Sequence, residues 1–291
     1  MGGGTVMPPP FRRLAIVLSP ADAVHTLLEH ADMLTRLWAP PALCLLAPED
    51  VEIHQLPSTL AAAREEGRAT IRHVRGPLLD AVLQEIVAFH ADLLLVGSGR
   101  SRDDRRSLVR RLAMQAPCSV WMVPAGAAAS IRRMLVPVDF SLRSADALTV
   151  ATAIAATSGA GCAVLHVRFD PTLAAPEETV TAVLGREQEA FSILTARTDL
   201  HGVEVEGLFE DSGDVAKVVL RVAEDRQADL TVMGTRGRTR AAALLIGSET
   251  EHVLQESARP VLAVKHFGAH LRLTEALLDP RFRRREGPRF G

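Results

Sequence analysis

The sequence predicts an α/β protein made of two tandem, open, doubly wound parallel five-stranded sheets. Three observations support this fold class: the length, the composition and an internal repeat. A chain of 291 residues is long enough for two domains of ordinary size. Its 47% hydrophobic content, with only 4% aromatic residues, suits parallel strands that are apolar on both faces and covered by helices.

The repeat is visible when distant parts of the chain are aligned. The first aligned pair joins residues 11–18 (FRRLAIVL) to residues 131–138 (IRRMLVPV). The second pair joins residues 91–97 (ADLLLVG) to residues 228–234 (ADLTVMG). Self-similarity of this kind marks a structural unit that occurs more than once. We therefore expect two copies of one fold in series.

A linker of small residues at 124–130 separates the two copies, because it has no helical or strand periodicity. We predict an N-terminal repeat over residues 11–124 and a C-terminal repeat over residues 131–265. The remaining residues, 266–291, form a basic tail.

Within each repeat, strands alternate with helices, which predicts βαβ units with right-handed crossovers and a parallel sheet. In the N-terminal repeat we predict strands near 12–18, 42–47, 69–75, 92–96 and 118–123. In the C-terminal repeat we predict strands near 132–138, 162–168, 203–209, 229–233 and 260–264, with helices near 142–157, 177–199, 214–226 and 249–257. The second helix of the N-terminal repeat is short, little more than Ser58 to Glu66.

One apolar stretch needs a separate interpretation. Residues 147–167 contain no Asp, Glu, Lys or Arg and are long enough to cross a bilayer. The stretch is mostly Ala and Thr, however, and residues 158–161 (SGAG) interrupt it. We predict a helix, a turn and a strand here, and no membrane partner.

A glycine pattern follows the fourth strand of the C-terminal repeat. Gly234 and Gly237 are separated by two residues, and nine further residues precede Gly247 and Ser248. In open α/β sheets, ligands bind beyond the carboxyl ends of the strands, where the strand order reverses. The pattern G-x2-G-x9-G-S therefore lies where a ligand is expected.

The chemistry of this loop favours phosphate. Glycines let backbone N–H groups approach phosphate oxygens and adopt positive φ without steric cost. A helix that starts near Ser248 adds unpaired N–H donors and the positive end of its dipole. Ser248 and Thr250 can add hydroxyl donors, and Arg236 can add a charge-assisted contact.

With its neighbours, this loop resembles the phosphate loop of the ATP-binding branch of the universal stress protein family. The resemblance covers Ile131 to Lys265 well and Phe11 to Val123 weakly. It rests on four segments: 135–141 (LVPVDFS), 233–237 (MGTRG), 245–251 (LIGSETE) and 259–265 (RPVLAVK).

The resemblance implies a fold like that of the adenine-nucleotide alpha hydrolases, with the two repeats packed as a pseudo-dimer through their fifth strands. It implies ATP, or ADP or AMP, as the ligand, with Mg²⁺ carried by the phosphates. In the family, the residue matching Asp139 faces the nucleotide, and the residue matching Val167 contacts adenine through its backbone. The cofactor-binding residues so implied are Pro137, Asp139, Val167, Met233, Gly234, Arg236, Gly237, Gly247, Ser248, Glu249 and Thr250.

Simpler interpretations stay open for several of these residues. Asp139 could cap the helix that follows it. Arg236 could be a solvated loop charge, and the glycines could be ordinary turn residues. We interpret His166 as a strand residue whose hydrogen bonds are satisfied within the fold.

The N-terminal repeat departs from the pattern. Ser19 stands where the C-terminal repeat has Asp139, and Arg100 stands where it has Gly237. The segment after Gly97 is six residues shorter than its counterpart, which places Asp104 and Arg105 opposite Gly247 and Ser248. Only the C-terminal repeat is therefore expected to bind nucleotide. The segment is basic, and we consider a solvated helix face or an anion or partner surface for Arg100, Arg102, Arg105, Arg106, Arg110 and Arg111.

Charge and cysteine usage exclude other classes. A net charge of −2 and a pI near 6.6 argue against nucleic-acid binding through the phosphate backbone. The three cysteines are far apart in apolar runs, which indicates reduced thiols and a cytoplasmic location. Histidines lack ligand spacing, so we predict no metal site held by the protein.

The leading hypothesis is an ATP-binding regulatory or stress-response protein with no catalytic residues, an unknown protein partner and a tendency to form a homodimer. No general base can be placed, so we expect at most a slow ATPase. One alternative is a slow ATPase or adenine-nucleotide hydrolase. Another is a nucleotide-independent interaction scaffold.

Overall fold

The computed structural model describes residues 9–19, 23–53, 55–99, 108–168, 177–235 and 246–265, without the side chains of 177–184. The N-terminal half contains β1 (Arg13–Val17), α1 (Val24–Trp38), β2 (Ala42–Pro48), α2 (Ser58–Glu65), β3 (Ala69–Val74), α3 (Leu78–Ala88), β4 (Leu93–Ser98), α5 (Arg110–Gln115) and β5 (Ser119–Pro124). The C-terminal half contains β6 (Arg133–Val138), α6 (Leu142–Ser158), β7 (Gly161–Arg168), α7 (Glu177–Arg197), β8 (Val205–Asp211), α8 (Val215–Asp225), β9 (Leu230–Gly234), α9 (Ser248–Glu256) and β10 (Val261–Val264). All ten predicted strands are confirmed, within one or two residues at most ends.

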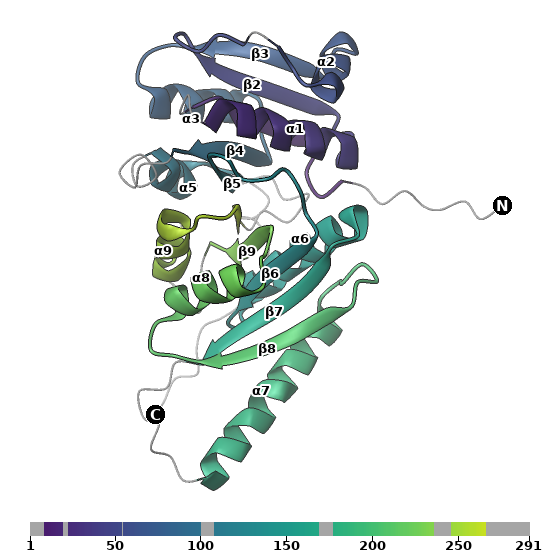
Figure 1. Cartoon of the computed structure of the whole chain (residues 1–291), viewed down its shortest axis with the longest axis vertical. Coiled ribbons are helices and arrows are strands. Elements are labelled where there is room, and N and C mark those ends of the chain that lie inside the picture. The colour runs from purple at the N-terminus through teal and green to yellow at the C-terminus, as the bar shows by residue number, and fades with distance from the viewer. Residues whose placement is uncertain are drawn as a thin grey trace, which may run out of the picture.

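The strands form one ten-stranded sheet in the order β3-β2-β1-β4-β5-β10-β9-β6-β7-β8 (Figure 1). Within each half the strands are parallel and follow the same order, so the predicted doubly wound topology is confirmed. The halves meet through β5 and β10, which pair antiparallel with Trp121 opposite Leu262. The predicted pairing of the fifth strands is thus confirmed, and it merges the two sheets into one.

Helices cover both faces of the sheet, because alternate residues of each strand enter different cores. Leu14 and Ile16 of β1 belong to the core under α1, α2, α6 and α7. Ala15 and Val17 belong to the core under α3, α5, α8 and α9. This two-sided burial explains the continuous apolar strands of the sequence.

The apolar stretch at 147–167 is a helix, a turn and a strand, as predicted. The turn residue Gly159 ends α6 at φ +72°, a left-handed conformation that favours glycine. Among the residues the structure describes, no helix combines the length and apolarity needed to cross a membrane.

An aspartate locks the first and fourth strands together in each half. The carboxylate of Asp92 accepts hydrogen bonds from the backbone N–H groups of Arg12 and Arg13, at 2.8 and 2.9 Å. Asp229 makes the equivalent bonds to Arg132 and Arg133. These contacts fix the amino ends of the first and fourth strands in the same way in both halves.

Candidate functional site

The strand order of the C-terminal half reverses between β6 and β9. Their carboxyl ends, at Val138 and Gly234, are followed by the segments that lead into α6 and α9. A crevice at this position is the usual ligand site of an open α/β sheet.

The pairing of β6 with β9 stops early. The registered pairs end at Leu135 opposite Thr231, although both strands run three residues farther. In the N-terminal half, the equivalent β1 and β4 stay paired over four positions to Val17 opposite Val96.

Pro137 explains this difference. The N–H of Asp229 donates to the carbonyl of Arg133, so the backbone groups of odd-numbered β6 residues face β9. Pro137 is the odd-numbered residue beyond Leu135, and proline has no N–H to continue the ladder. Val17 occupies the same position in β1 and keeps its donor. The hydrogen-bonded ladder between the two central strands therefore ends earlier in the C-terminal half than in the N-terminal half.

Asp139 directly follows Val138, the last residue of β6, and supports the start of α6. Its Oδ1 accepts bonds from the Ser141 N–H at 3.1 Å and from the Ser144 hydroxyl at 3.0 Å. The N-cap itself is Ser141, whose hydroxyl oxygen accepts from the Ser144 N–H. The simple capping interpretation of Asp139 is therefore wrong in detail, because Asp139 braces a cap that another residue makes.

The N-terminus of α9 faces the same end of β9. Its cap residue Gly247 donates from its N–H to the Thr235 carbonyl at 2.7 Å and carries no side chain that could occupy the first helical N–H groups. Those groups lack partners inside the helix by geometry and carry the positive end of its dipole. The backbone of Gly247, at φ −64° and ψ 145°, is open to any residue. The expected positive φ is thus absent at this position, and the absence of a Cβ is what remains distinctive.

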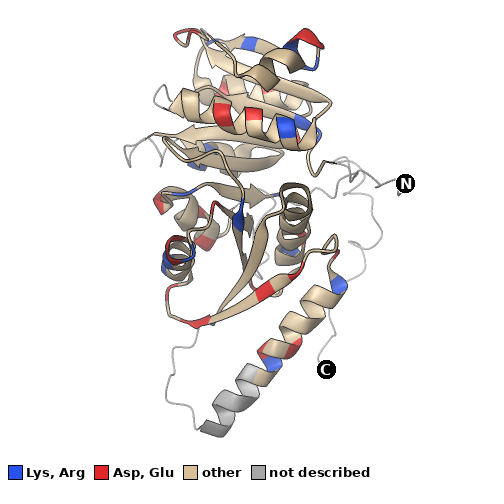
Figure 2. Cartoon of the chain, turned by 45° about the vertical axis from the view of Figure 1, so that its right-hand side comes forward, with Lys and Arg blue, Asp and Glu red and all other residues tan. Residues whose placement is uncertain are grey.

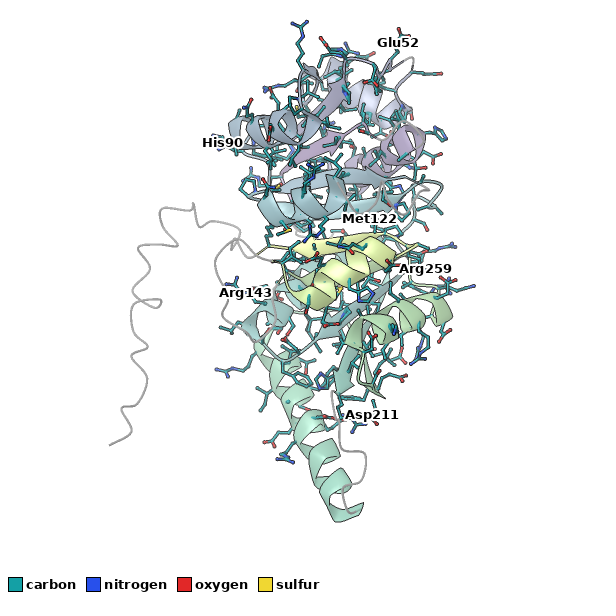
Figure 3. All side chains as sticks on the ribbon, turned by 90° about the vertical axis from the view of Figure 1, so that its left-hand side faces the viewer. Glu52, His90, Met122, Arg143, Asp211 and Arg259 are labelled. Carbon is teal, nitrogen blue, oxygen red and sulfur yellow. The ribbon has the colours of Figure 1, made fainter. Side chains whose placement is uncertain are left out.

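Gly234 is required for packing. A Cβ on this residue would lie 2.9 Å from the backbone oxygen of Arg143, in the first turn of α6 (Figure 3). In the N-terminal half a Cβ on Gly97 would lie 2.6 Å from the Cβ of Ala23. Both halves therefore keep this glycine to bring a helix onto the sheet. Like Gly247, Gly234 does not have a positive φ.

Thr250 and Glu249 hold α9 in place. The Thr250 hydroxyl donates to the Gly234 carbonyl at 2.8 Å, and its side chain is buried. Glu249 accepts a bond from the Ala216 N–H, at the start of α8, at 3.0 Å. The structure thus uses both side chains for internal contacts. Ser248 is exposed, and its hydroxyl lies 3.3 Å from the Glu249 carboxylate.

Two further predicted residues can offer only backbone or surface contacts. The Met233 side chain is 5% exposed and packs in the core under α8 and α9. Val167 lies one residue past His166, the last β7 residue paired with β6. Since the Gly161 N–H donates to the Arg132 carbonyl, the backbone of odd-numbered β7 residues, including Val167, faces β6. Arg236 and Gly237 lie outside the described residues, as do Arg100, Asp104 and Arg105 of the N-terminal half.

His166 is satisfied within the fold, as expected. Its Nδ1 lies 2.9 Å from the Val138 carbonyl, and its ring is 4.3 Å from the ring of Phe140. On the α7 side, its Nε2 lies 3.9 Å from the carboxylate of Glu187, which also pairs with Arg168.

Phe140 and Ser144 are site residues that the sequence analysis missed. Phe140 follows Asp139 with φ +58°, a conformation that costs energy in a residue with a side chain. No sequence signal marks this conformation. The spacing of Ser141 and Ser144 after a strand is a capping pattern that could have identified Ser144.

The arrangement suits an anion. It combines a strand ladder that ends early with a helix N-terminus that has no side-chain cap, while the carboxylate of Asp139 follows the neighbouring strand β6. Among the described residues, no group of three or more His, Cys, Asp or Glu side chains could hold a metal ion.

Comparison with known proteins adds an independent line of evidence. Residues 130–265 match the universal stress protein family. A universal stress protein of Thermus aquaticus is 33% identical over 139 residues, which cover 46% of this chain and 98% of that protein. A match to a universal stress protein of Methanocaldococcus jannaschii, 43% identical over 47 residues, covers only 29% of that protein. A crystal structure from Pseudomonas aeruginosa UCBPP-PA14, assigned to the same family, shares the fold at a TM-score of 0.68 and 23% identity, over 88% of this chain and 93% of that one.

Proposed function

The chain belongs to the universal stress protein family, and from this premise we propose that it is a regulatory protein that binds one adenine nucleotide. The site lies in the C-terminal repeat, over residues 131–265. The N-terminal repeat, over residues 11–124, binds none. The basic tail predicted over residues 266–291 lies outside the described residues.

The observation that carries this proposal is the start of α9 just beyond the carboxyl end of β9. Gly247 places no side chain over the first N–H groups of that helix, and the ladder between β6 and β9 ends early at the same switch point, because Pro137 has no N–H. A helix N-terminus beyond the switch point of an open α/β sheet is the usual place for a phosphate group.

The donors near the carboxyl ends of β6 and β9 fit the two ends of a nucleotide. The phosphates take the N-terminus of α9 at Gly247 and Ser248, together with the loop that contains Arg236 and Gly237. The adenosine end takes the side of Asp139 and the backbone of Val167. Mg²⁺ enters with the phosphates, whose charge it neutralises.

Binding without efficient chemistry is the expected behaviour of a regulatory protein. A ligand shifts a conformational balance only by its different affinity for two states, and hydrolysis is not required for this. The alternatives are a slow ATPase or adenine-nucleotide hydrolase, which a turnover assay tests, and a nucleotide-independent scaffold, which the titration below tests.

We place the protein in the cytoplasm, as a homo-oligomer. Burial raises the pKa of the Cys118 and Cys162 thiols to about 12, which favours the inert thiol form expected in a reducing compartment. Acidic and basic side chains are interspersed over both halves in the view of Figure 2, which suits a partner other than nucleic acid.

Calorimetric titration of nucleotide-free protein with ATP tests the proposal. We expect one site per chain, and we expect Gly247→Val and Gly237→Val to abolish binding while the fold is retained. The Gly247 backbone accepts a valine, so a loss of binding reflects the side chain that blocks the phosphates.

Gly213→Val is the matched control. A Cβ on Gly213 meets nothing within 4 Å, and the residue precedes α8 instead of α9. Two equivalent sites, or no heat in the parent protein, would contradict a single C-terminal site. Normal binding by both loop variants would show that the loop is structural and would contradict the proposed site, whereas a parent protein that binds no nucleotide would favour the scaffold alternative.

A further inference from the structure

The two halves touch through α5 and α9, which lie side by side across the junction (Figures 1 and 3). In this contact, Nε of Arg110 on α5 donates to Oε1 of Glu251 on α9. The side chains of Arg110 and Glu251 are 42% and 26% exposed. The ion pair therefore joins the N-terminal repeat to the helix that begins at the candidate phosphate site.

Glu251 belongs to the first turn of α9. Its N–H donates to the Gly247 carbonyl at 2.9 Å, which closes that turn. Together with Glu249 it places two carboxylates in the same turn. Carboxylates there stabilise the helix through its dipole, but they repel an anion that uses the same N–H groups.

Both carboxylates accept hydrogen bonds, and their donors come from different halves of the chain. Glu249 accepts from the Ala216 N–H, within the C-terminal half. Glu251 is engaged by the guanidinium of Arg110, from the N-terminal half, and accepts from the Gln255 amide at 3.2 Å. Of these partners only Arg110 carries a full charge that offsets a carboxylate.

We propose that Arg110 is a positioning residue for the phosphate end of the nucleotide site, and that it acts by neutralising Glu251. The N-terminal repeat then tunes the affinity of the C-terminal repeat for charged nucleotides, although it lacks its own loop. This inference rests on the proposed nucleotide function and deepens it.

The test compares Arg110→Gln, Glu251→Gln and the double variant in titrations with ATP, ADP, AMP and adenosine. Arg110→Gln leaves an uncompensated carboxylate and weakens ATP binding about two- to fivefold, the usual range for one charge at a helix N-terminus. Glu251→Gln leaves an uncompensated guanidinium and strengthens ATP binding by a similar factor. The double variant returns close to the parent, since both charges are gone.

The series of ligands separates charge from packing. The effect of Arg110→Gln decreases from ATP to AMP, vanishes for adenosine and shrinks in high salt. Half-exposed ion pairs add little to stability, so the variants remain folded. Arg221→Gln is the control: it removes an exposed pair between Arg221 on α8 and Glu210 on β8, and it leaves all affinities unchanged.

Each failure has its own signature. A parent protein that binds no nucleotide overturns the proposed function, and this inference with it. A parent that binds ATP while both single variants weaken it equally, or weaken adenosine as much as ATP, overturns the inference alone.

Discussion

Gly234 illustrates how a single residue can serve packing and a ligand site at once. Its counterpart Gly97 is retained in the half whose loop has lost the nucleotide pattern. In both glycines, an added Cβ would lie less than 3 Å from an atom at the start of the neighbouring helix. Retention in both halves therefore points to packing. Gly247 has no glycine counterpart, since Asp104 stands in its place, and so it is the more specific marker of a ligand.

Gly234→Ala should destabilise the protein by about 1–3 kcal/mol, because the new methyl group enters the space of the Arg143 backbone oxygen. Urea unfolding measures the loss. Gly185→Ala in α7 is a control of opposite sign, since its Cβ meets nothing within 4 Å and alanine favours a helix by about 0.5–1 kcal/mol. A Gly234→Ala variant as stable as the parent would show that α6 can move and that the steric account is wrong.

At the scale of the element, the end of one strand distinguishes the two halves. β1 and β6 have the same neighbours and the same amino-terminal lock, yet the ladder of β6 to β9 ends two residues before Pro137. The missing N–H of one proline ends this ladder early, with α6 on one face of the sheet and α9 on the other. The proposed site therefore involves β6 as well as the glycine loop.

Pro137→Val tests this directly. The valine restores the donor present at Val17, so β6 and β9 can pair farther and the backbone groups at the switch point become engaged in the ladder. We expect weaker ATP binding in calorimetry, with the free energy of unfolding within about 1 kcal/mol of the parent, because a regained hydrogen bond offsets the greater entropy of the unfolded chain. An unchanged affinity for ATP would show that nucleotide binding does not depend on the proline.

At the scale of the whole molecule, the ten-stranded sheet is continuous across the two halves, so helices of the N-terminal half contact helices of the C-terminal half. β5 and β10 pair through Trp121 and Leu262, and the Lys265 ammonium donates to the Met114 and Ala116 carbonyls across the same junction. A repeat without a nucleotide loop can thus still act on the repeat that has one.

Turnover of ATP should be far below ~1 s⁻¹, the lower end of ordinary enzymes. The described carboxylates near α9 are already engaged: Glu249 with Ala216 and Glu251 with Arg110. Asp139 accepts two bonds at the start of α6, on the side that we propose for adenosine. Phosphate release by purified protein measures the rate, with Gly247→Val as background. A rate near or above that value, lost in the variant, would establish the ATPase alternative.

Much of the fold could be predicted because its signals are local or repeated. Apolar strands, the internal repeat and the break at 158–161 define the elements, and the right-handed crossover rule leaves few topologies. The glycine spacing predicts a candidate site at the carboxyl end of β9, beside the switch point of the sheet. The roles of its members were harder to predict: Thr250, Glu249 and Met233 carry suitable atoms or positions, but their partners come from β9, α8 and the core.

The sequence alone determined the fold class, the two repeats and the strand that precedes the glycine loop, since these depend on periodicity and on residue types near one another in the chain. The tertiary structure decided which atoms remain available for a ligand, because hydrogen-bond partners are chosen by proximity in space. It decided that Arg110 faces Glu251 at a separation of 141 residues. It also decided that Pro137 ends a ladder, because a missing donor matters only where a neighbouring strand lies opposite it.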